Sequence, residues 1–331
     1  MAVLVTGGAG YIGSHTVREL IRSGRDVVVY DSLGGGHRQA VGNVPLVTGD
    51  LHDTPKLVQT IRKNGIDGVI HFAALIQVGE SMKEPEKYYL NNVAGTLSLL
   101  KAMRETKVNR IIFSSTAAVY GEPESVPITE NAALKPTSVY GRTKLMIESI
   151  LSDYDLAYGL RYAALRYFNV AGADPSGEIG EDHDPEPHII PLIIKTLMGQ
   201  RDHFSLFGTD YPTEDGTCIR DYIHVTDLAQ AHILALNWIE QNRESRIYNL
   251  GNGNGFSNRQ IIDTVERVSG RKLEVEEAAR RAGDPAALVA GSERIKSELG
   301  WKPRLHDLGT IVETAWKWHT SHPDGFGGKK L

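Results

Sequence analysis

The chain opens with Ala2-Val3-Leu4-Val5-Thr6-Gly7-Gly8-Ala9-Gly10-Tyr11-Ile12-Gly13-Ser14. Its apolar, β-branched start is typical of a buried strand, and a helical pattern follows over Ile12–Ser23. The glycines between them permit a tight turn and a close approach of the backbone to a ligand. The helix N-terminus behind the turn would supply amide donors and a positive dipole end to a pyrophosphate. The order strand, glycine turn, helix therefore predicts a dinucleotide-binding loop rather than an ordinary strand–helix turn.

Beyond this stretch, short β-branched runs alternate with longer helical patterns. The runs expected to be strands are Val3–Val5, Val27–Tyr30, Leu46–Thr48, Gly68–Phe72, Arg110–Ser114 and Tyr162–Arg166. The segments expected to be helices are Ile12–Ser23, Pro55–Asn64, Tyr88–Glu105 and Ser138–Tyr158. The strands are apolar almost throughout, as strands covered on both faces are. The alternation predicts an α/β fold, a Rossmann-type doubly wound parallel sheet.

After about Gly172 the character of the sequence changes. Residues Gly172–Pro191 are rich in Pro, Gly, Asp and Glu and predict a long loop, a kind of segment that is often functional. Later elements are expected as helices at Ile189–Met198, Val225–Ile239, Ser257–Val268 and Leu305–Ser321 and a strand at Ile247–Leu250. We therefore expect a dinucleotide-binding domain, 1–172, and a smaller C-terminal α/β lobe, 173–331. Whether parts of 225–250 return to the first domain stays open at this stage.

Acidic residues follow the second and third expected strands. Asp31 lies 18 residues after Gly13, where a carboxylate can accept hydrogen bonds from ribose hydroxyls and repel a 2′-phosphate. This favours NAD over NADP, although Arg38, a few residues on, keeps NADP open. Asp50 is placed to reach adenine, and equally to be an ordinary turn carboxylate.

Tyr140 and Lys144 are four residues apart at the start of a helical pattern, so they share one helix face. A free phenol is roughly 0.1% ionised at pH 7, and lowering its pKa by about 3 requires about 4 kcal/mol. A neighbouring ammonium and a positively charged nicotinamide are the available sources of that energy in a partly dry site. Because the pair follows a dinucleotide-binding loop in the sequence, it predicts a catalytic phenol. Without such a loop, a Tyr and a Lys at this spacing would more often be two exposed residues on a helix surface.

Thr116 lies where the strand Ile111–Thr116 ends, at the sheet edge that binds ligands. Its hydroxyl can hydrogen-bond a substrate hydroxyl and pass the proton to Tyr140. The alternative is a hydroxyl that only satisfies loop backbone.

Composition limits the classes of partner and compartment. The 331 residues carry a formal net charge of −5, which disfavours nucleic acid and anionic membranes. Cys218 is the single cysteine, so no internal disulfide forms, and no run of about 20 apolar residues would span a bilayer. The N-terminal residues lack the charged start and apolar length of a signal peptide. We expect a cytoplasmic protein.

His183 and His188 match no zinc spacing, and we expect no metal site.

Together these motifs resemble the extended short-chain dehydrogenase/reductase family over essentially the whole chain. The similar segments are TGGAGYIGSHT, VIHFAA, VGES, YYLNNVAGT, FSSTAAVYGE, YGRTK, LRYFNVAGADPSG, FGTDYPTEDGTCIRDYIHV, YNLGNG and RRAGDP. The first and fifth are shared across the superfamily. The block FGTDYPTEDGTCIRDYIHV is far more specific to the nucleotide-sugar epimerases within it.

The resemblance implies roles for individual residues. Tyr140 is implied to be the catalytic base, Lys144 to bind the nicotinamide ribose, and Thr116 to be the hydroxyl partner, where many members have Ser. The residues implied to contact NAD are Gly7, Gly10, Tyr11, Ile12, Gly13, Asp31, Asp50, Leu51, Phe72, Ala73, Asn91, Tyr140, Lys144 and Tyr167. Some relatives have Lys where this chain has Ile76, which puts one cofactor contact in doubt.

The resemblance also implies a UDP-hexose as substrate. The implied contacts are Thr116, Asn169, Phe207, Arg220, Arg281, Asp284 and Leu288. Asn169 and the two arginines match groups that hold the diphosphate, Asp284 a ribose ligand, and Phe207 an aromatic beside uracil. The charge argument supports the arginines independently, because an acidic chain must hold a diphosphate with local cations and arginine does so bidentately.

The implied activity interconverts UDP-glucose and UDP-galactose at carbon 4 of the sugar, through a transient 4-keto sugar and tightly bound NAD. Some epimerases carry a bulky Tyr where this chain has Leu288, so the smaller side chain predicts room for N-acetylated UDP-hexosamines such as UDP-GlcNAc. Ala117 and Ala118 stand where dehydratase and decarboxylase relatives carry Asp or Glu, which argues against elimination. The alternatives left open are another UDP-sugar 4-epimerase, a nucleotide-sugar oxidoreductase that consumes NAD, and a non-catalytic dinucleotide sensor.

A homodimer is a further implication of the resemblance, paired through helices of the first domain. The segments Tyr88–Met103 and Leu145–Tyr158 carry the apolar residues Leu97, Leu100, Ile147, Ile150 and Leu151. These faces fit either a dimer contact or intramolecular core.

Overall fold

The computed structural model describes residues 2–242, 244–281 and 284–327. Its strands are β1 (Ala2–Thr6), β2 (Asp26–Asp31), β3 (Leu46–Thr48), β4 (Ile66–His71), β5 (Arg110–Thr116), β6 (Arg161–Tyr167), β7 (Asn169–Ala171), β8 (Phe204–Phe207), β9 (Ile219–His224), β10 (Arg246–Leu250), β11 (Gly255–Ser257), β12 (Val275–Ala278) and β13 (Ala287–Leu288). Its helices are α1 (Tyr11–Arg22), α2 (Thr54–Lys63), α3 (Val78–Lys83), α4 (Pro85–Tyr88), α5 (Gly95–Thr106), α6 (Val139–Tyr158), α7 (Ile189–Leu197), α8 (Val225–Asn242), α9 (Asn258–Ser269), α10 (Glu293–Leu299) and α11 (Leu308–Ser321). Short turns η1 (Arg38–Val41), η2 (Tyr89–Ala94) and η3 (Ala117–Val119) complete them.

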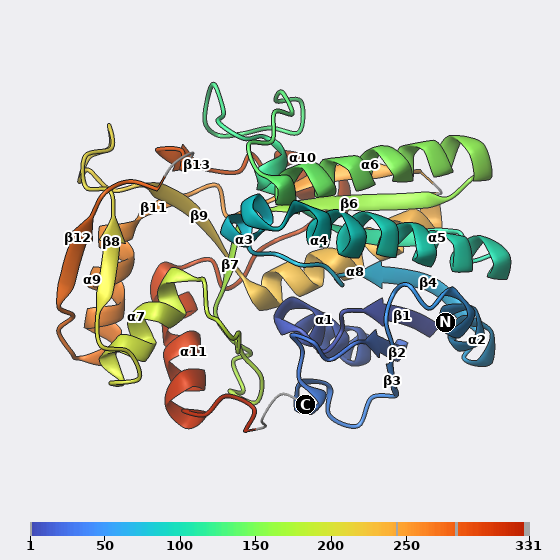
Figure 1. Ribbon diagram of the computed structural model, residues 1–331, viewed down its shortest axis with the longest axis horizontal. Coiled ribbons are helices and arrows are strands. Elements are labelled where there is room, and N and C mark those ends of the chain that lie inside the picture. The colour runs from blue at the N-terminus through green and yellow to red at the C-terminus, as the bar shows by residue number, and fades with distance from the viewer. Residues whose placement is uncertain (1, 243, 282–283, 328–331) are drawn as a thin grey trace.

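Seven of the described strands form one parallel sheet in the order β10-β6-β5-β4-β1-β2-β3. From the central strand β1, the chain adds β2 and β3 toward one edge of the sheet. It then crosses back to place β4 on the other side of β1, and β5, β6 and β10 follow toward the opposite edge. Figure 1 shows α5 and α6 lying along one side of this sheet. The Rossmann-type doubly wound sheet predicted from the sequence is thus confirmed. Its ligand crevice is expected where the order reverses, at the carboxyl ends of β1 and β4.

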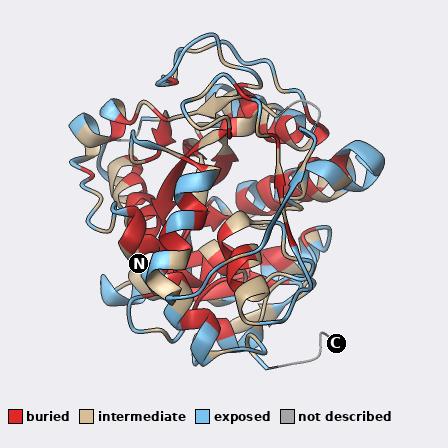
Figure 2. Ribbon diagram, turned by 90° about the vertical axis from the view of Figure 1, so that its left-hand side faces the viewer, coloured by how far each residue is buried: buried red, intermediate tan, exposed pale blue. Residues whose placement is uncertain are grey.

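Apolar layers cover both faces of the large sheet. On one face Leu20 of α1 packs in a cluster with Leu236 of α8. On the other, Leu57 of α2, Leu99 of α5 and Ile147 of α6 share a second cluster. All five side chains are buried, and Figure 2 shows burial concentrated in the strands and the inner sides of the helices. At about 1.5–3 kcal/mol for each buried aliphatic side chain, these layers supply the main driving force for the sheet.

The C-terminal part has its own core and smaller sheets. Strand β9 pairs with β7, β11 and β13, and β8 pairs with β12. Ile193 of α7, Ile261 of α9 and Ile311 of α11 meet in one buried cluster. Two later elements lie with the large sheet, since β10 pairs with β6 and α8 packs beside α1. None of the described helices combines the length and apolarity required to cross a membrane.

Several predicted elements differ from the observed ones. The helix expected over Tyr88–Glu105 is present but is not α-helical throughout, because η2 is a π-helical turn between α4 and α5. The buried Asn92 amide lies in this turn and binds the backbone of Leu75 in both directions, at 2.8 and 3.1 Å. π-Helical turns are frequent at functional sites. The strands β7, β8, β11, β12 and β13 were not expected, because with two to four residues they are too short for alternation to be recognised. The six-residue β9 was also missed, because Arg220 and Asp221 interrupt its apolar run.

His71 ends β4 and is only 2% exposed. Its Nδ1 lies 2.7 Å from Thr6 Oγ1 and its Nε2 lies 2.9 Å from Thr96 Oγ1. Burial, aided by the charge of Lys144, lowers the pKa of His71 to about 3. The ring therefore stays neutral in the folded chain at any pH above that value.

We predict that His71 contributes to acid instability. Between about pH 6.5 and pH 3 the unfolded chain binds a proton here that the folded chain does not, so the free energy of unfolding falls as the pH falls. In His71→Gln this pH slope becomes flatter by up to about 1.4 kcal/mol per pH unit. Urea unfolding at several pH values measures it, with exposed His203→Gln as the control. An unchanged slope in His71→Gln would contradict the prediction.

Candidate active site

The turn after β1 excludes side chains at two of its glycines. Gly7 has φ +73°, and a Cβ there would lie 2.5 Å from the backbone N of Ala73. A Cβ at Gly13 would lie 2.2 Å from the carbonyl oxygen of Gly7. At Gly10 the nearest atom would be 3.4 Å away, an ordinary contact. The fold itself thus requires Gly7 and Gly13, whereas Gly10 leaves an open place for a ligand to approach the backbone.

Helix α1 begins directly behind Gly10, which is its N-cap and offers no side-chain hydrogen bond. The first amides of the helix, including those of Tyr11 and Ile12, therefore have no intrahelical acceptor. Such amides and the helix dipole favour a pyrophosphate. Unlike its backbone amide, the Tyr11 side chain is already hydrogen-bonded within the chain: its hydroxyl donates to Gly172 O at 2.5 Å. Burial raises the pKa of this hydroxyl well above its usual value.

Asp31 ends β2 beside this turn and is 8% exposed. Its carboxylate accepts hydrogen bonds from Ala9 N at 2.9 Å and Leu33 N at 2.8 Å. Burial raises the pKa of Asp31, although both backbone donors act in the opposite direction. Each carboxylate oxygen keeps a further lone pair, so Asp31 can hold the loop and also accept from ribose hydroxyls.

The other residues predicted to contact NAD line the ends of β3 and β4. Asp50 is exposed and accepts from the backbone and ring of His52 at 2.8 and 2.7 Å, which lowers its pKa. Leu51 is buried next to the start of α5. Phe72 N and Ala73 N both donate to Thr6 O, at 2.8 and 3.1 Å, which holds the end of β4 against that of β1.

Asn91 and Asn92 lie in the π-helical turn η2. Asn91 Nδ2 donates to Asn92 Oδ1 at 2.8 Å, and Asn92 Nδ2 lies 3.2 Å from Thr143 Oγ1 of α6. Asn92 therefore connects the loop after β4 with the helix that carries Tyr140 and Lys144. Sequence reasoning missed this role; an asparagine within an otherwise apolar helical pattern was the available signal.

The three predicted catalytic residues meet at the carboxyl end of β5. Ser138 caps α6, its Oγ accepting from Gly141 N at 3.0 Å, so Tyr140 and Lys144 fall in the first turns of the helix. Lys144 Nζ donates to Ser114 O at 2.7 Å and lies 5.9 Å from the centre of the Tyr140 ring. The hydroxyl of Thr116, the last residue of β5, accepts a hydrogen bond from Ala118 N at 3.2 Å, as the loop-backbone alternative expects. It also lies near enough to the Tyr140 phenol to lower the pKa of that group.

Burial acts against ionisation of this pair. It raises the pKa of Tyr140 to about 12, with the Thr116 hydrogen bond opposing it. It lowers the pKa of Lys144 to about 7, with Glu148 opposing it. A positive charge near a phenol favours its ionised form, so a charged Lys144 acts in the opposite direction to burial. A further positive charge is needed to bring the pKa of the phenol near 7.

A buried ion pair lies next to the predicted catalytic residues and was missed by the sequence analysis. Glu148 accepts from Arg166 Nε at 2.9 Å and Arg166 Nη2 at 2.5 Å, and also from Ser115 Oγ at 2.5 Å. Arg166 Nη1 also donates to Tyr120 OH at 2.9 Å. The spacing of Glu148 four residues after Lys144 was the signal that could have revealed it. Its carboxylate favours the charged form of that lysine.

Tyr167 ends β6 in register with Thr116 of β5. Its hydroxyl is hydrogen-bonded to Ser114 Oγ, the side chain of the residue whose carbonyl receives Lys144. Tyr167 thus lies beside the predicted catalytic residues, and its hydrogen bond holds the strand end that binds Lys144.

On the C-terminal side the structure pairs four predicted substrate residues. The Arg220 guanidinium of β9 forms an ion pair with Asp284 and donates to Ile219 O at 2.7 Å. The Arg281 guanidinium lies 4.2 Å from the centre of the Phe207 ring. A guanidinium beside a carboxylate and another over an aromatic ring provide the charge and stacking groups that a nucleoside diphosphate needs.

Asn169 and Leu288 connect the two parts of the site. Asn169 of β7 is in register with Tyr222 of β9, two residues from Arg220. Leu288 of β13 is in register with Arg220 and packs against the small cluster of Ala117, Val119, Tyr120 and Ile128. Because that cluster begins directly after Thr116, Leu288 is a neighbour both of the segment that follows Thr116 and of Arg220.

The chain belongs to the NAD dependent epimerase/dehydratase family, whose model matches residues 3–251. Within it, the chain is 50% identical to the UDP-glucose 4-epimerase of Lacticaseibacillus casei over 330 residues, 99% of this chain and 100% of that protein. The crystal structure of UDP-glucose 4-epimerase from Brucella ovis in complex with NAD is 51% identical, with a TM-score of 0.93 over 95% of this chain and 97% of that one. The UDP-glucose 4-epimerase from Bifidobacterium longum in complex with NAD+ and UDP is 40% identical, with a TM-score of 0.93 over 98% and 100%.

Alanine at Gly13 and at Gly10 should have different effects. Gly13→Ala forces a Cβ onto the Gly7 carbonyl, so the free energy of unfolding of nucleotide-free protein falls by about 1–3 kcal/mol. Gly10→Ala meets no such contact and should keep that stability, but retain at least tenfold less NAD because the pyrophosphate can no longer approach. Urea unfolding and the nucleotide released on denaturation measure the two effects. Equal stability of both variants would be inconsistent with this reading of the turn.

Proposed function

We propose that this protein is an NAD-dependent epimerase that interconverts UDP-glucose and UDP-galactose. The observation that carries the proposal is the meeting of Thr116, Tyr140 and Lys144 at the carboxyl end of β5, the same edge of the parallel sheet at which the glycine turn follows β1. Arg220 and Arg281 lie in the C-terminal part of the chain. The similarity to UDP-glucose 4-epimerases over nearly the whole chain supports the same conclusion.

The residues present fit NAD. Gly10 leaves the backbone open, the first amides of α1 lack acceptors, and Asp31 keeps lone pairs for a ribose. We propose that residues 1–172, with α8 and β10, form the part that holds NAD, and that the remaining residues hold the UDP-sugar. NAD, when bound, supplies reversible hydride chemistry at carbon 4 of the sugar and is regenerated in each turnover.

The chain's own residues move the proton. The phenolate of Tyr140 accepts the proton of the sugar 4-hydroxyl through the Thr116 hydroxyl. After the sugar has rotated to present its opposite face, the phenol returns a proton to the oxygen on carbon 4. Lys144 keeps its ammonium beside the phenol through Ser114 O. The arginines hold the diphosphate while the hexose rotates about it.

The neighbouring positions support epimerisation over elimination. Ala117 and Ala118 follow Thr116 and carry no group that can transfer a proton. An oxidoreductase that consumes NAD would release NADH with UDP-glucose, and a dinucleotide sensor would show no turnover. The intact Tyr140–Lys144 pair is unnecessary for a sensor.

Tyr140→Phe tests the proposed base directly. The parent protein should convert UDP-galactose without added nucleotide and with a carbon-4 deuterium retained in the sugar. In Tyr140→Phe we expect kcat to fall by at least about 100-fold, since a positioned acid–base group typically contributes 10²–10⁴-fold. Exposed Tyr158→Phe is the matched control and should retain the parent rate. Parent-like turnover by Tyr140→Phe, or loss of the deuterium to solvent, would refute the mechanism.

The position of Leu288 leads to a prediction about sugar scope. Leu288 is a neighbour of Arg220 and of the segment after Thr116, and it is smaller than the Tyr that some epimerases carry there. The parent should therefore have room to epimerise UDP-GlcNAc as well. Leu288→Tyr should lower kcat/KM for UDP-GlcNAc at least tenfold and leave UDP-galactose within about threefold, as one pocket group is worth 1–3 kcal/mol. Leu288→Met conserves volume and serves as control. If parent and Leu288→Tyr fail equally on UDP-GlcNAc, the neighbouring loops close the pocket instead.

We also propose a cytoplasmic homodimer. Of the apolar residues expected at its contact, Leu100, Ile147 and Leu151 are buried within the chain and do not take part. Leu97 of α5 and Met146 of α6 remain exposed and support pairing through these helices. Light scattering that gives the mass of one chain would exclude the dimer, and cell fractionation tests the compartment expected from the single cysteine.

A further inference from the structure

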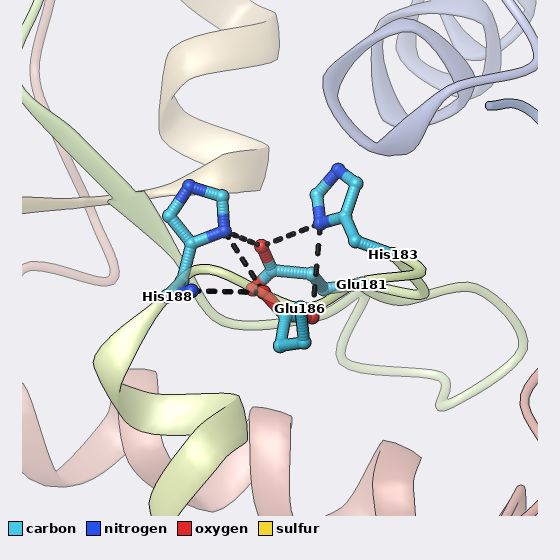
Figure 3. A group of neighbouring side chains, drawn as sticks. All are labelled: Glu181, His183, Glu186 and His188. Atoms are coloured by element: carbon cyan, nitrogen blue, oxygen red, sulfur yellow. Dashed lines mark hydrogen bonds and ion pairs between the residues drawn. The ribbon is translucent and has the colours of Figure 1, made fainter. Parts of the chain in front are cut away.

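The loop between β7 and α7 folds four potential metal ligands into one cluster. These are Glu181, His183, Glu186 and His188, and Figure 3 shows the two imidazoles on either side of the two carboxylates. One donor atom from each side chain lies within 4.8 Å of all the others. His188 is also the N-cap of α7 (Ile189–Leu197), so the cluster closes the loop at the point where the helix begins.

Three of the donor atoms, on Glu181, His183 and Glu186, are buried and have no well-aligned hydrogen bond. The fourth, Nδ1 of the partly exposed His188, is hydrogen-bonded to Glu186 Oε1 at 3.1 Å. The side chains of Glu181 and Glu186 are 4% and 3% exposed. His183 Nδ1 lies 3.1 Å from Glu181 Oε1 and 3.7 Å from Glu186 Oε2, yet these three atoms make no well-aligned hydrogen bond. His188 Nδ1 lies 2.7 Å from the same Glu181 oxygen. Buried polar atoms are normally hydrogen-bonded, so short separations without alignment indicate lone pairs that converge on a common centre.

We propose that Glu181, His183, Glu186 and His188 bind one divalent transition-metal ion, and that zinc is the ion they fit best. Zinc takes imidazole nitrogen and carboxylate oxygen at about 2.0–2.2 Å, which places tetrahedral donors about 3.4 Å apart. Three of the separations, 2.7, 3.1 and 3.7 Å, lie on both sides of that value, and all four donors lie within 4.8 Å of one another. Two histidines argue against calcium and magnesium, which prefer oxygen ligands throughout.

The site connects parts of the chain that must stay together for NAD and UDP-sugar to meet. The His183 ring lies edge-on to the Tyr11 ring of α1, with centres 6.1 Å apart, and Tyr11 follows the glycine turn. The Glu181 carbonyl accepts from Trp318 Nε1 of α11 at 3.2 Å. Four protein donors fill a tetrahedral zinc, as in structural sites, and leave no open position for substrate. The ion therefore stabilises the loop between α1 and the C-terminal core.

The competing explanation is a metal-free network of charges. Burial alone would lower the pKa of both histidines, but the two carboxylates raise it to about 9 for His183 and about 10 for His188. Two imidazolium ions would then balance two carboxylates. A metal ion displaces those protons and takes over the carboxylates, so direct measurement of bound metal distinguishes the two explanations.

Metal binding is measured on the tag-free full chain. After dialysis against zinc and desalting, mass spectrometry of the metal should find about one zinc per parent chain. Glu181→Gln and His188→Ala should retain only background zinc, whereas exposed His203→Ala is the matched control and should retain one. Chelation should lower the Tm of the parent by several degrees and leave that of His188→Ala unchanged, because the ion binds only the folded chain.

A second readout covers variants that fail to fold. Cobalt in place of zinc should give the intense visible bands of a tetrahedral ion in the parent protein. A weak octahedral spectrum, absence of stoichiometric zinc in the parent, or equal zinc in the parent and both folded ligand variants would overturn the proposal in favour of the charge network. Turnover of UDP-galactose in the same samples reports on the proposed function separately, so either proposal can fail without the other.

Discussion

The structure depends on the close contact between the ends of β1 and β4. Gly7 lies against the backbone of Ala73, and no Cβ can be accommodated between them. The same turn places the Gly7 carbonyl under Gly13, so the first turn of α1 sits directly on the strand end. Because the sheet order reverses at this point, the contact opens the crevice in which a dinucleotide can bind. Every other feature of the site is arranged around that crevice.

A second constraint is electrostatic. Tyr140 and Lys144 are both buried, and burial by itself favours a protonated phenol and a neutral amine. Two groups favour the charged form of Lys144. One is the Glu148 carboxylate, which Arg166 holds in place, and the other is Ser114 O, which accepts a hydrogen bond from the lysine. These groups keep the ammonium form within reach at neutral pH. The phenol becomes a useful base only when further positive charge is present, which ties the acid–base chemistry to an occupied cofactor site.

Strand β9 connects the C-terminal residues that we propose to bind the substrate with the large sheet. This strand carries Arg220 and pairs on one side with β7, which directly follows β6 of the large sheet. On its other sides it pairs with β13 and β11, and β13 brings Leu288 next to the arginine. The loop that follows β7 runs past Tyr11 to α7, and its cluster of histidines and carboxylates lies along that path. Fold and site are thus joined by the same few backbone segments.

The amino-acid sequence by itself determined the parallel sheet, the dinucleotide turn and the Tyr140–Lys144 pair, because these depend on local periodicity and on short spacings. Tertiary structure alone decided which groups set the pKa values, since Glu148 and Arg166 come from different elements and meet only in the core. It also produced the cluster that includes His183 and His188, which matches no linear zinc pattern because the loop, rather than a helix or hairpin, brings the donors together. The spacing of residues along the chain predicts contacts within one helix or strand. Contacts between elements depend on how those elements pack, which spacing does not reveal.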